Sequence, residues 1–180
     1  MERTNFNKDL KMHLACAKND ETRPVMNCIY FKDGFAYASD SHILVKNKLD
    51  ECSTLEASFI EALDGKILSA NNYKDILKYD EILIAEDGIE ATKGTDKAFF
   101  YFEKNLTYPN AESVIQSALN KQHIALSEVG LNTKLLVKLN EALSGAGSCK
   151  LQFYGAGNAV VLQGMEQASL GIIMPVLLSE

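Results

Sequence analysis

The 180-residue sequence has no tryptophan, only three prolines and only three histidines. Its four cysteines lack Cys-x-x-Cys spacing, which favours small buried hydrophobic side chains in a reducing compartment over a zinc cage or a disulfide framework. The histidines are equally scattered along the chain. The sequence therefore predicts no metal, no cofactor and no disulfide.

Long apolar runs and an excess of positive charge are also absent. No apolar run approaches the roughly 20 residues of a membrane-spanning helix, and the polar start lacks the apolar region of a signal peptide. We expect a cytoplasmic protein with no membrane partner. The formal net charge of −6 argues against a surface coated for nucleic-acid binding. One segregated basic face stays possible, because the local field matters more than the sum.

Catalytic motifs are weak. Ser39-Asp40-Ser41-His42 contains the residue types of a hydrolytic triad, but neighbours on one strand cannot converge on one reacting atom. The Gly145-Ala-Gly147 segment lacks the spacing of a phosphate-binding loop and follows a predicted helix instead of preceding one. We expect a non-enzymatic protein, and an enzyme of unrecognised type is a minor alternative.

The first third of the sequence predicts a helix followed by a hairpin. Phe6, Leu10, Leu14 and Ala17 recur at helical spacing and predict a helix over residues 5–19. Two β-rich runs around Asp33-Gly34 predict a hairpin over residues 23–39, and residues 43–45 continue as a strand. Phe59 and Ile60 are predicted at the centre of a further strand.

The remaining sequence contains an internal repeat of about 50 residues, each copy too small to bury its own sheet face. The first copy predicts a strand at 66–69, a helix at 70–79 and strands at 81–85, 89–92 and 97–102. The second copy predicts a strand at 123–127, a helix at 132–143, strands at 150–154 and 159–163, and a final strand that ends at Pro175. Asn71-Asn72 and Asn132-Thr133 are candidate helix N-caps. Residues 108–120 are the plausible joint between the copies.

Lysines gather on the three predicted helices, whereas five carboxylates lie in each of the segments 50–64 and 80–90. On a single helix, a solvated face is the simpler interpretation of such lysines. Their recurrence on three helices in an acidic protein favours a functional basic surface. The lysines are Lys8, Lys11 and Lys18, then Lys74 and Lys78, and finally Lys134 and Lys138.

Several motifs, in order, resemble the bacterial DNA sliding clamp, the β subunit of the replicative polymerase. Thr22-Arg-Pro-Val-Met-Asn27, a hairpin and Ala38-Ser-Asp-Ser-His-Ile-Leu44 resemble its middle domain, and Tyr108-Pro-Asn-Ala-Glu-Ser-Val-Ile115 resembles the exit of that domain. Gly130-Leu-Asn132 and Ile172-Ile-Met-Pro-Val-Leu-Leu178 resemble the second half of its final domain. The resemblance implies an α+β clamp fold of repeated strand-helix-strand-strand units, with helices on one face of antiparallel sheets. It divides the chain into a complete clamp-like domain at 1–119 and half a domain at 120–180.

The resemblance also implies a function: a sliding-clamp-like processivity or scaffold protein in DNA replication. The expected partners are non-specific double-stranded DNA, replication proteins that carry a clamp-binding peptide, and further copies of the chain in a homo-oligomer. DNA would contact Arg23 and the seven lysines named above. The peptide cleft would be formed by Met26, Ser39, Ser41, His42, Ile43, Leu44, Pro109, Val114, Ile115, Ile172, Met174, Pro175, Val176 and Leu178.

The sequence departs from the family within this cleft. The family has arginines where this chain has Ile43, Ser113 and Leu177, and a glycine in place of Ser41. The cleft should therefore be less basic and more apolar than in the family. Two alternatives stay open: a peptide-binding regulatory module that uses the cleft without encircling DNA, and core strands that simply meet there without a binding role.

Overall fold

The computed structural model describes residues 4–126, 128–143, 148–164 and 168–176. The strands are β1 (Cys28–Lys32), β2 (Phe35–Ser39), β3 (Ile43–Lys48), β4 (Ile67–Ser69), β5 (Glu81–Ile84), β6 (Gly88–Lys93), β7 (Asp96–Tyr101), β8 (Cys149–Gln152), β9 (Val160–Gly164) and β10 (Ser169–Ile173). The helices are α1 (Leu49–Cys52), α2 (Ala57–Ala62), α3 (Ala70–Ile76), α4 (Ala111–Leu119) and α5 (Thr133–Ala142), with 3-10 turns η1 (Met12–Leu14) and η2 (Pro24–Asn27).

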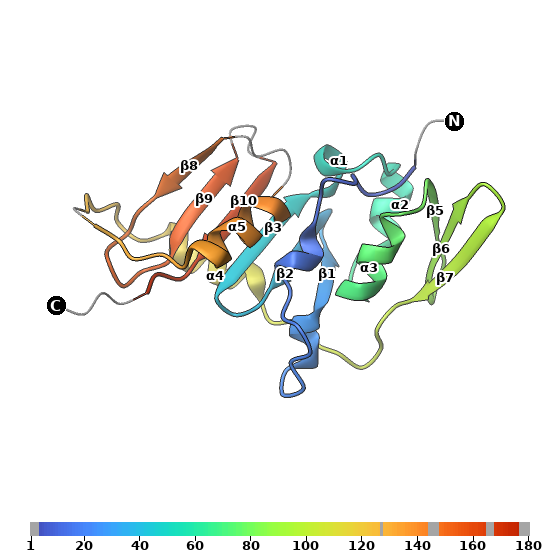
Figure 1. Ribbon diagram of the computed structural model, residues 1–180, viewed down its shortest axis with the longest axis horizontal. Coiled ribbons are helices and arrows are strands. Elements are labelled where there is room, and N and C mark those ends of the chain that lie inside the picture. The colour runs from blue at the N-terminus through green and yellow to red at the C-terminus, as the bar shows by residue number, and fades with distance from the viewer. Residues whose placement is uncertain (1–3, 127, 144–147, 165–167, 177–180) are drawn as a thin grey trace.

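These strands form a seven-stranded sheet in the order β4-β1-β2-β3-β10-β9-β8 and a three-stranded sheet in the order β5-β6-β7. Every neighbouring pair in both sheets is antiparallel. Figure 1 shows β5-β6-β7 at one end of an elongated molecule and β8-β9-β10 at the other, with β1, β2 and β3 between them. The predicted α+β class with antiparallel sheets is confirmed.

The predicted hairpin is β1 and β2, which are joined by a tight turn. Asp33 and Gly34 both have positive φ, at 51° and 78°. Two consecutive positive φ values are what a two-residue hairpin turn requires, which explains the Asp-Gly sequence. Strand β10 then lies between β3 and β9, so the C-terminal part of the chain continues the sheet that the hairpin begins.

The seven-stranded sheet has a hydrophobic cluster on each face. Ile29 and Phe31 of β1 belong to the larger cluster, which also includes Tyr73 of α3 and Leu139 of α5. The second cluster joins residues of β2, β3, β9 and β10 to Ile115 of α4. Because side chains alternate across a strand, α3 and α5 cover one face of the sheet and α4 covers the other (Figure 1).

The predicted helix over residues 5–19 is wrong, since only the turn η1 within it is helical. Thr4 instead forms a parallel bridge with Glu81 of β5. The buried Asn5 side chain donates to the carbonyls of Ile76 and Tyr79, both at 3.0 Å. These contacts hold the start of the segment extended against α3 and β5, so tertiary pairing overrides the local helical period.

Other predicted elements also differ. Phe59 and Ile60 lie in the helix α2 and not in the predicted strand. Both side chains are partly buried against the larger hydrophobic cluster. Residues 123–126 form no strand, although the Ile124 amide donates to Phe153, and Ser127 lies outside the described residues. Ser69, not Asn71 or Asn72, caps α3, by accepting a hydrogen bond from the Asn72 amide.

The segment predicted as the joint between the copies, residues 108–120, contains α4. Asn110 caps this helix by accepting a hydrogen bond from the Ser113 amide at 2.9 Å. Ala111, Ile115 and Ala118 fall at helical spacing and are buried. The capping residue and the apolar spacing were both visible in the sequence and could have predicted this helix. The predicted α5 and its cap by Asn132 are confirmed.

Candidate functional site

A groove lies where β3 begins and β10 ends, and these two strands pair in the middle of the seven-stranded sheet. Ile172 lies opposite Leu44, and the Met174 amide just beyond β10 donates to the His42 carbonyl at 2.9 Å. The segment that leads into α4 closes the other side, and the groove has a volume of about 190 Å³. It is lined by Met26, Ser39, Ser41, His42, Ile43, Leu44, Tyr108, Pro109, Ala111, Val114, Ile172 and Met174.

Most of the residues predicted for the peptide cleft lie together in this groove. Ile115 is instead buried beneath it, with 1% of its surface exposed. Pro175 and Val176 do not line the groove, and the Val176 amide donates to the Gly130 carbonyl. Leu178 lies outside the described residues. Sequence reasoning missed Tyr108 and Ala111, although Tyr108 directly precedes the predicted Pro109 and Ala111 lies two residues after it.

The groove is apolar, with a buried floor and exposed rims. Leu44 and Ile172 are buried, whereas Val114 and Met174 are 52% and 44% exposed. The Ser39 hydroxyl donates to the Ile43 carbonyl at 2.7 Å, so it is already satisfied. A concave apolar surface with few free polar groups can accept hydrophobic side chains of a ligand.

The predicted DNA contact Arg23 lies at the rim of this groove. Its guanidinium binds the Asp20 carboxylate at 2.9 Å and donates to the Ser41 hydroxyl at 2.7 Å. Hydrogen bonds from the Thr22 hydroxyl and the Arg23 amide, together with the Arg23 guanidinium, lower the pKa of Asp20. Ser41 has a φ of 78°, in the left-handed region that favours glycine. The arginine thus braces a strained turn beside the groove.

Tyr108 forms a wall of the groove and has an unusual hydroxyl. This hydroxyl is buried and lacks a hydrogen-bond partner of normal geometry among the described residues. Burial raises the pKa of Tyr108 more than the nearby Ser39 amide lowers it. The Tyr108 ring stacks on Tyr30, with ring centroids 5.1 Å apart.

The lysine-bearing segments lie side by side, because η1 contacts both α3 and α5. Acidic side chains are interleaved with the lysines, and two of them, Asp75 and Glu141, belong to α3 and α5 themselves. The expected sorting of charge, with basic helices and acidic sheet and loops, is therefore incomplete. The ion pairs are Lys8–Asp80 at 3.7 Å, Lys11–Glu141 at 3.0 Å, Lys78–Asp75 at 2.6 Å and Lys138–Asp40 at 3.7 Å. Among the described residues, Lys18, Lys74 and Lys134 form no ion pair.

His13 lies in η1 among these lysines. Burial lowers its pKa, and the positive charges of Lys74 and Lys11 lower it further. Its Nδ1 atom is buried without a hydrogen-bond partner in the described part of the chain. The cluster therefore favours a neutral imidazole.

The residues with possible catalytic chemistry have structural roles. Asp40 accepts hydrogen bonds from the His42 and Ile43 amides at 2.9 and 3.0 Å, which is a turn and not a triad. Across residues 4–126, 128–143, 148–164 and 168–176, no three His, Cys, Asp or Glu side chains are grouped as metal ligands would be. No helix in those ranges is long and apolar enough to cross a membrane.

The α+β arrangement of antiparallel sheets with α3 and α5 on one face matches the fold of solved DNA sliding clamps. No protein-family model matches the sequence, and no curated protein matches it. Solved structures do match. The DNA polymerase III subunit beta of Bartonella birtlesii, bound to griselimycin, has a TM-score of 0.65 and 17% identity over 95% of this chain and 64% of that chain.

Two further clamps agree. The Helicobacter pylori beta clamp in complex with diflunisal has a TM-score of 0.69 and 14% identity over 99% of this chain and 66% of that chain. The Bacillus subtilis clamp has a TM-score of 0.65 and 13% identity over 96% of this chain and 62% of that chain. The chain thus has the sliding-clamp fold and spans less than two thirds of the Bartonella and Bacillus proteins.

Proposed function

We propose that this chain is a non-enzymatic, clamp-like scaffold of DNA replication that holds a short peptide of a replication protein in its groove. The observation that carries the proposal is that distant segments of the chain meet in one groove. Three segments far apart in the sequence, around Leu44, Pro109 and Ile172, form one exposed apolar groove in a sliding-clamp fold.

The shape and chemistry of the groove suit a peptide with two apolar anchors. The exposed Val114 and Met174 give such a ligand an accessible rim, and the buried Leu44 and Ile172 form the floor. Apolar anchors in desolvated pockets carry most of the energy of small interfaces. Arg23, the cation at the rim, already binds Asp20. We therefore expect peptide binding to depend little on salt.

The test is titration of the protein with a fluorescently labelled synthetic peptide that carries one leucine and one phenylalanine anchor. Met174→Ala should weaken binding at least about tenfold, because an exposed anchor contact of about 1.4 kcal/mol or more is lost. Leu44→Asp should have a larger effect, with folding checked by circular dichroism because Leu44 is buried. Lys134→Ala on α5 is the control and should bind as the wild type does. The absence of saturable binding to the wild-type protein would contradict the proposal.

We also propose weak, sequence-independent binding of duplex DNA through lysines that flank η1 and lysines on or directly after α3 and α5, namely Lys8, Lys11, Lys18, Lys74, Lys78, Lys134 and Lys138. This binding should weaken steeply with added salt, because each phosphate contact releases counterions. Lys74→Glu combined with Lys78→Glu should abolish it without unfolding, since exposed substitutions rarely cost more than about 0.5 kcal/mol. Lys93→Glu combined with Lys97→Glu, on the β6-β7 hairpin, is the matched control and should retain the affinity.

The interleaved carboxylates favour a second candidate function, a peptide-binding regulatory module that does not encircle DNA. Four of the predicted DNA-contacting lysines are paired with acidic side chains. If the wild-type protein has no affinity for duplex DNA at low ionic strength while the peptide still binds, this candidate replaces the scaffold.

Encircling DNA would require several copies of a chain that we divide into a full domain at 1–119 and half a domain at 120–180. We propose a homo-oligomer on this ground. Light scattering of the purified protein gives the mass in solution, and a monomer at all concentrations would again favour the regulatory module.

A further inference from the structure

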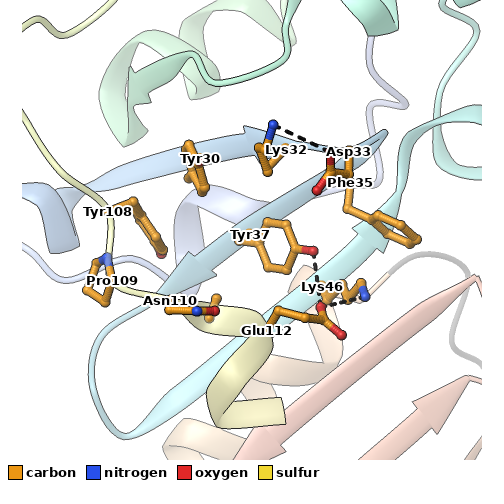
Figure 2. Close-up of a pocket in the computed structure, with 11 residues that line it drawn as sticks. Tyr30, Lys32, Asp33, Phe35, Tyr37, Lys46, Tyr108, Pro109, Asn110 and Glu112 are labelled. Carbon is orange, nitrogen blue, oxygen red and sulfur yellow. Dashed lines mark hydrogen bonds and ion pairs between the residues drawn. The ribbon is translucent and has the colours of Figure 1, made fainter. Parts of the chain in front are cut away.

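A second pocket lies beside the groove, on the outer face of β1, β2 and β3. Figure 2 shows this pocket between the hairpin and the N-terminal end of α4. Its volume is about 510 Å³. Tyr108, Pro109 and Ala111 line both this pocket and the groove, so the two hollows share a wall.

A continuous row of aromatic rings lines this pocket. Tyr30 and Tyr37 lie opposite each other in the β1-β2 ladder, so their rings share a face, with centroids 6.3 Å apart. Phe35 extends the row beyond Tyr37 at 6.4 Å, and Tyr108 extends it beyond Tyr30 at 5.1 Å. Tyr30 and Tyr108 are stacked at an interplanar angle of 15°. The shared wall is thus one end of this row.

The charged groups of the pocket are paired with one another or with neighbours. Lys46 binds the Glu112 carboxylate at 2.7 Å, and its ammonium lies 4.1 Å from the centre of the Phe35 ring. Lys32 binds Asp64 at 2.7 Å and Asp33 at 3.4 Å. A cationic or anionic ligand group would therefore meet no unpaired opposite charge, and it would lose hydration without compensation. The cation–π position over Phe35 is also taken.

We propose that this pocket is a third anchor site, which binds an uncharged aromatic side chain of the same peptide that occupies the groove. The inference rests on the proposed peptide-binding function. The stacked Tyr30 and Tyr108 rings offer an aromatic platform at the end of the pocket next to the groove, and the Lys46–Glu112 ion pair closes the other end. An extended peptide advances about 3.3 Å per residue, so it can cross the wall within a few residues.

The experiment uses synthetic peptides with the same two apolar anchors and one additional residue, attached at either end through a short glycine spacer. That residue is tryptophan, lysine, aspartate or, as the reference, alanine. We expect the tryptophan peptide, in one of its two orientations, to bind about tenfold tighter than the alanine peptide, from ring stacking and burial. Lysine and aspartate should give no gain.

Protein variants assign this gain to the pocket. Tyr30→Leu keeps an apolar side chain but removes the stacking partner, so it should lower the affinity of the tryptophan peptide to that of the alanine peptide. The alanine peptide itself should bind this variant as it binds the wild type. Tyr101→Ala is the matched control, because Tyr101 is an exposed tyrosine on β7 of the other sheet.

The outcomes separate the two proposals. If no peptide binds, the proposed function fails. If the four added residues give equal affinity at both ends of the peptide, the groove is functional and the third anchor site is overturned. Tighter binding of the lysine or aspartate peptide would also overturn the third anchor site, because the pocket would then select a charged side chain. A tryptophan gain that persists in Tyr30→Leu would place the aromatic residue elsewhere and would also overturn it.

Discussion

The structure contains two units with the same local pattern, a helix followed by three antiparallel strands. One unit is α3 with β5-β6-β7, and the other is α5 with β8-β9-β10. They differ at the last strand. Strand β10 pairs with β3 as well as β9, whereas β7 pairs with β6 alone among the described residues. The same helix and three strands therefore form in both units. Whether the last strand can form a wall of a groove depends on which strand it pairs with on its other side.

The sequences of the two last strands reflect this difference. In β10, Ser169, Gly171, Ile172 and Ile173 are all buried. In β7, Lys97, Phe99 and Tyr101 are exposed, and the residues between them are half-buried. Nearly continuous burial is typical of a strand covered on both faces, and alternation is typical of a strand with one face in water.

The largest expected effect comes from truncating one residue in each last strand. Ile173 is fully buried, so Ile173→Ala should lower the free energy of unfolding by about 3 kcal/mol. Phe99 is 42% exposed, and Phe99→Ala should cost about 1 kcal/mol or less. Urea denaturation of both variants measures the difference. Equal losses would mean that the two units are energetically equivalent, against the comparison.

A smaller effect is expected where α5 approaches β10. A Cβ atom added at Gly171 would lie 2.8 Å from Leu139 Cδ1 and 3.1 Å from Leu139 Cγ. Gly171→Ala should therefore destabilise the protein by about 2 kcal/mol through overpacking. Gly157→Ala is the control, because no atom lies within 4 Å of its added Cβ. If Gly171→Ala has wild-type stability in urea, the close approach of helix and strand is not a constraint on this unit.

The smallest effect concerns His13, which lies in η1, the turn that contacts the helices of both units. Lys74 faces it from α3 and Glu141 from α5, with Lys11 and Lys18 from its own segment. The folded pKa lies below the ordinary 6.5, so the unfolded chain binds more protons below that pH. The stability contribution should be present above pH 6.5 and should decline as the pH falls through it. His13→Gln should remove this part of the pH dependence in denaturation profiles between pH 7.5 and 5.5, and an unchanged profile would contradict the assignment.

The arrangement of the groove was largely predictable because short motifs marked all of its walls. Leu44, Pro109 and Ile172 each lie in a segment whose residue order resembles the clamp family, and the structure brings the three together. Propensity alone gave no such information. It took the resemblance to place residues more than 60 positions apart in one groove.

The errors came from segments whose structure depends on distant partners. The spacing of Phe6 and Leu10 fits a helix, but the Asn5 side chain ties the start of this segment to the carbonyls that end α3. The aromatic Phe59 and the β-branched Ile60 favour a strand by propensity. In the structure both lie in α2, where they pack against the larger hydrophobic cluster. The ring row beside the groove was missed because its members come from β1, β2 and the segment before α4, and only the strand register aligns them.

The ring row also has a spectroscopic consequence. Because the chain has seven tyrosines and no tryptophan, its intrinsic fluorescence comes from tyrosine. A tryptophan side chain bound in the pocket close to Tyr30 and Tyr108 would accept excitation energy from these donors, and the tyrosine emission would fall as tryptophan emission rises. The protein therefore contains its own optical reporter for an aromatic ligand, without any attached dye.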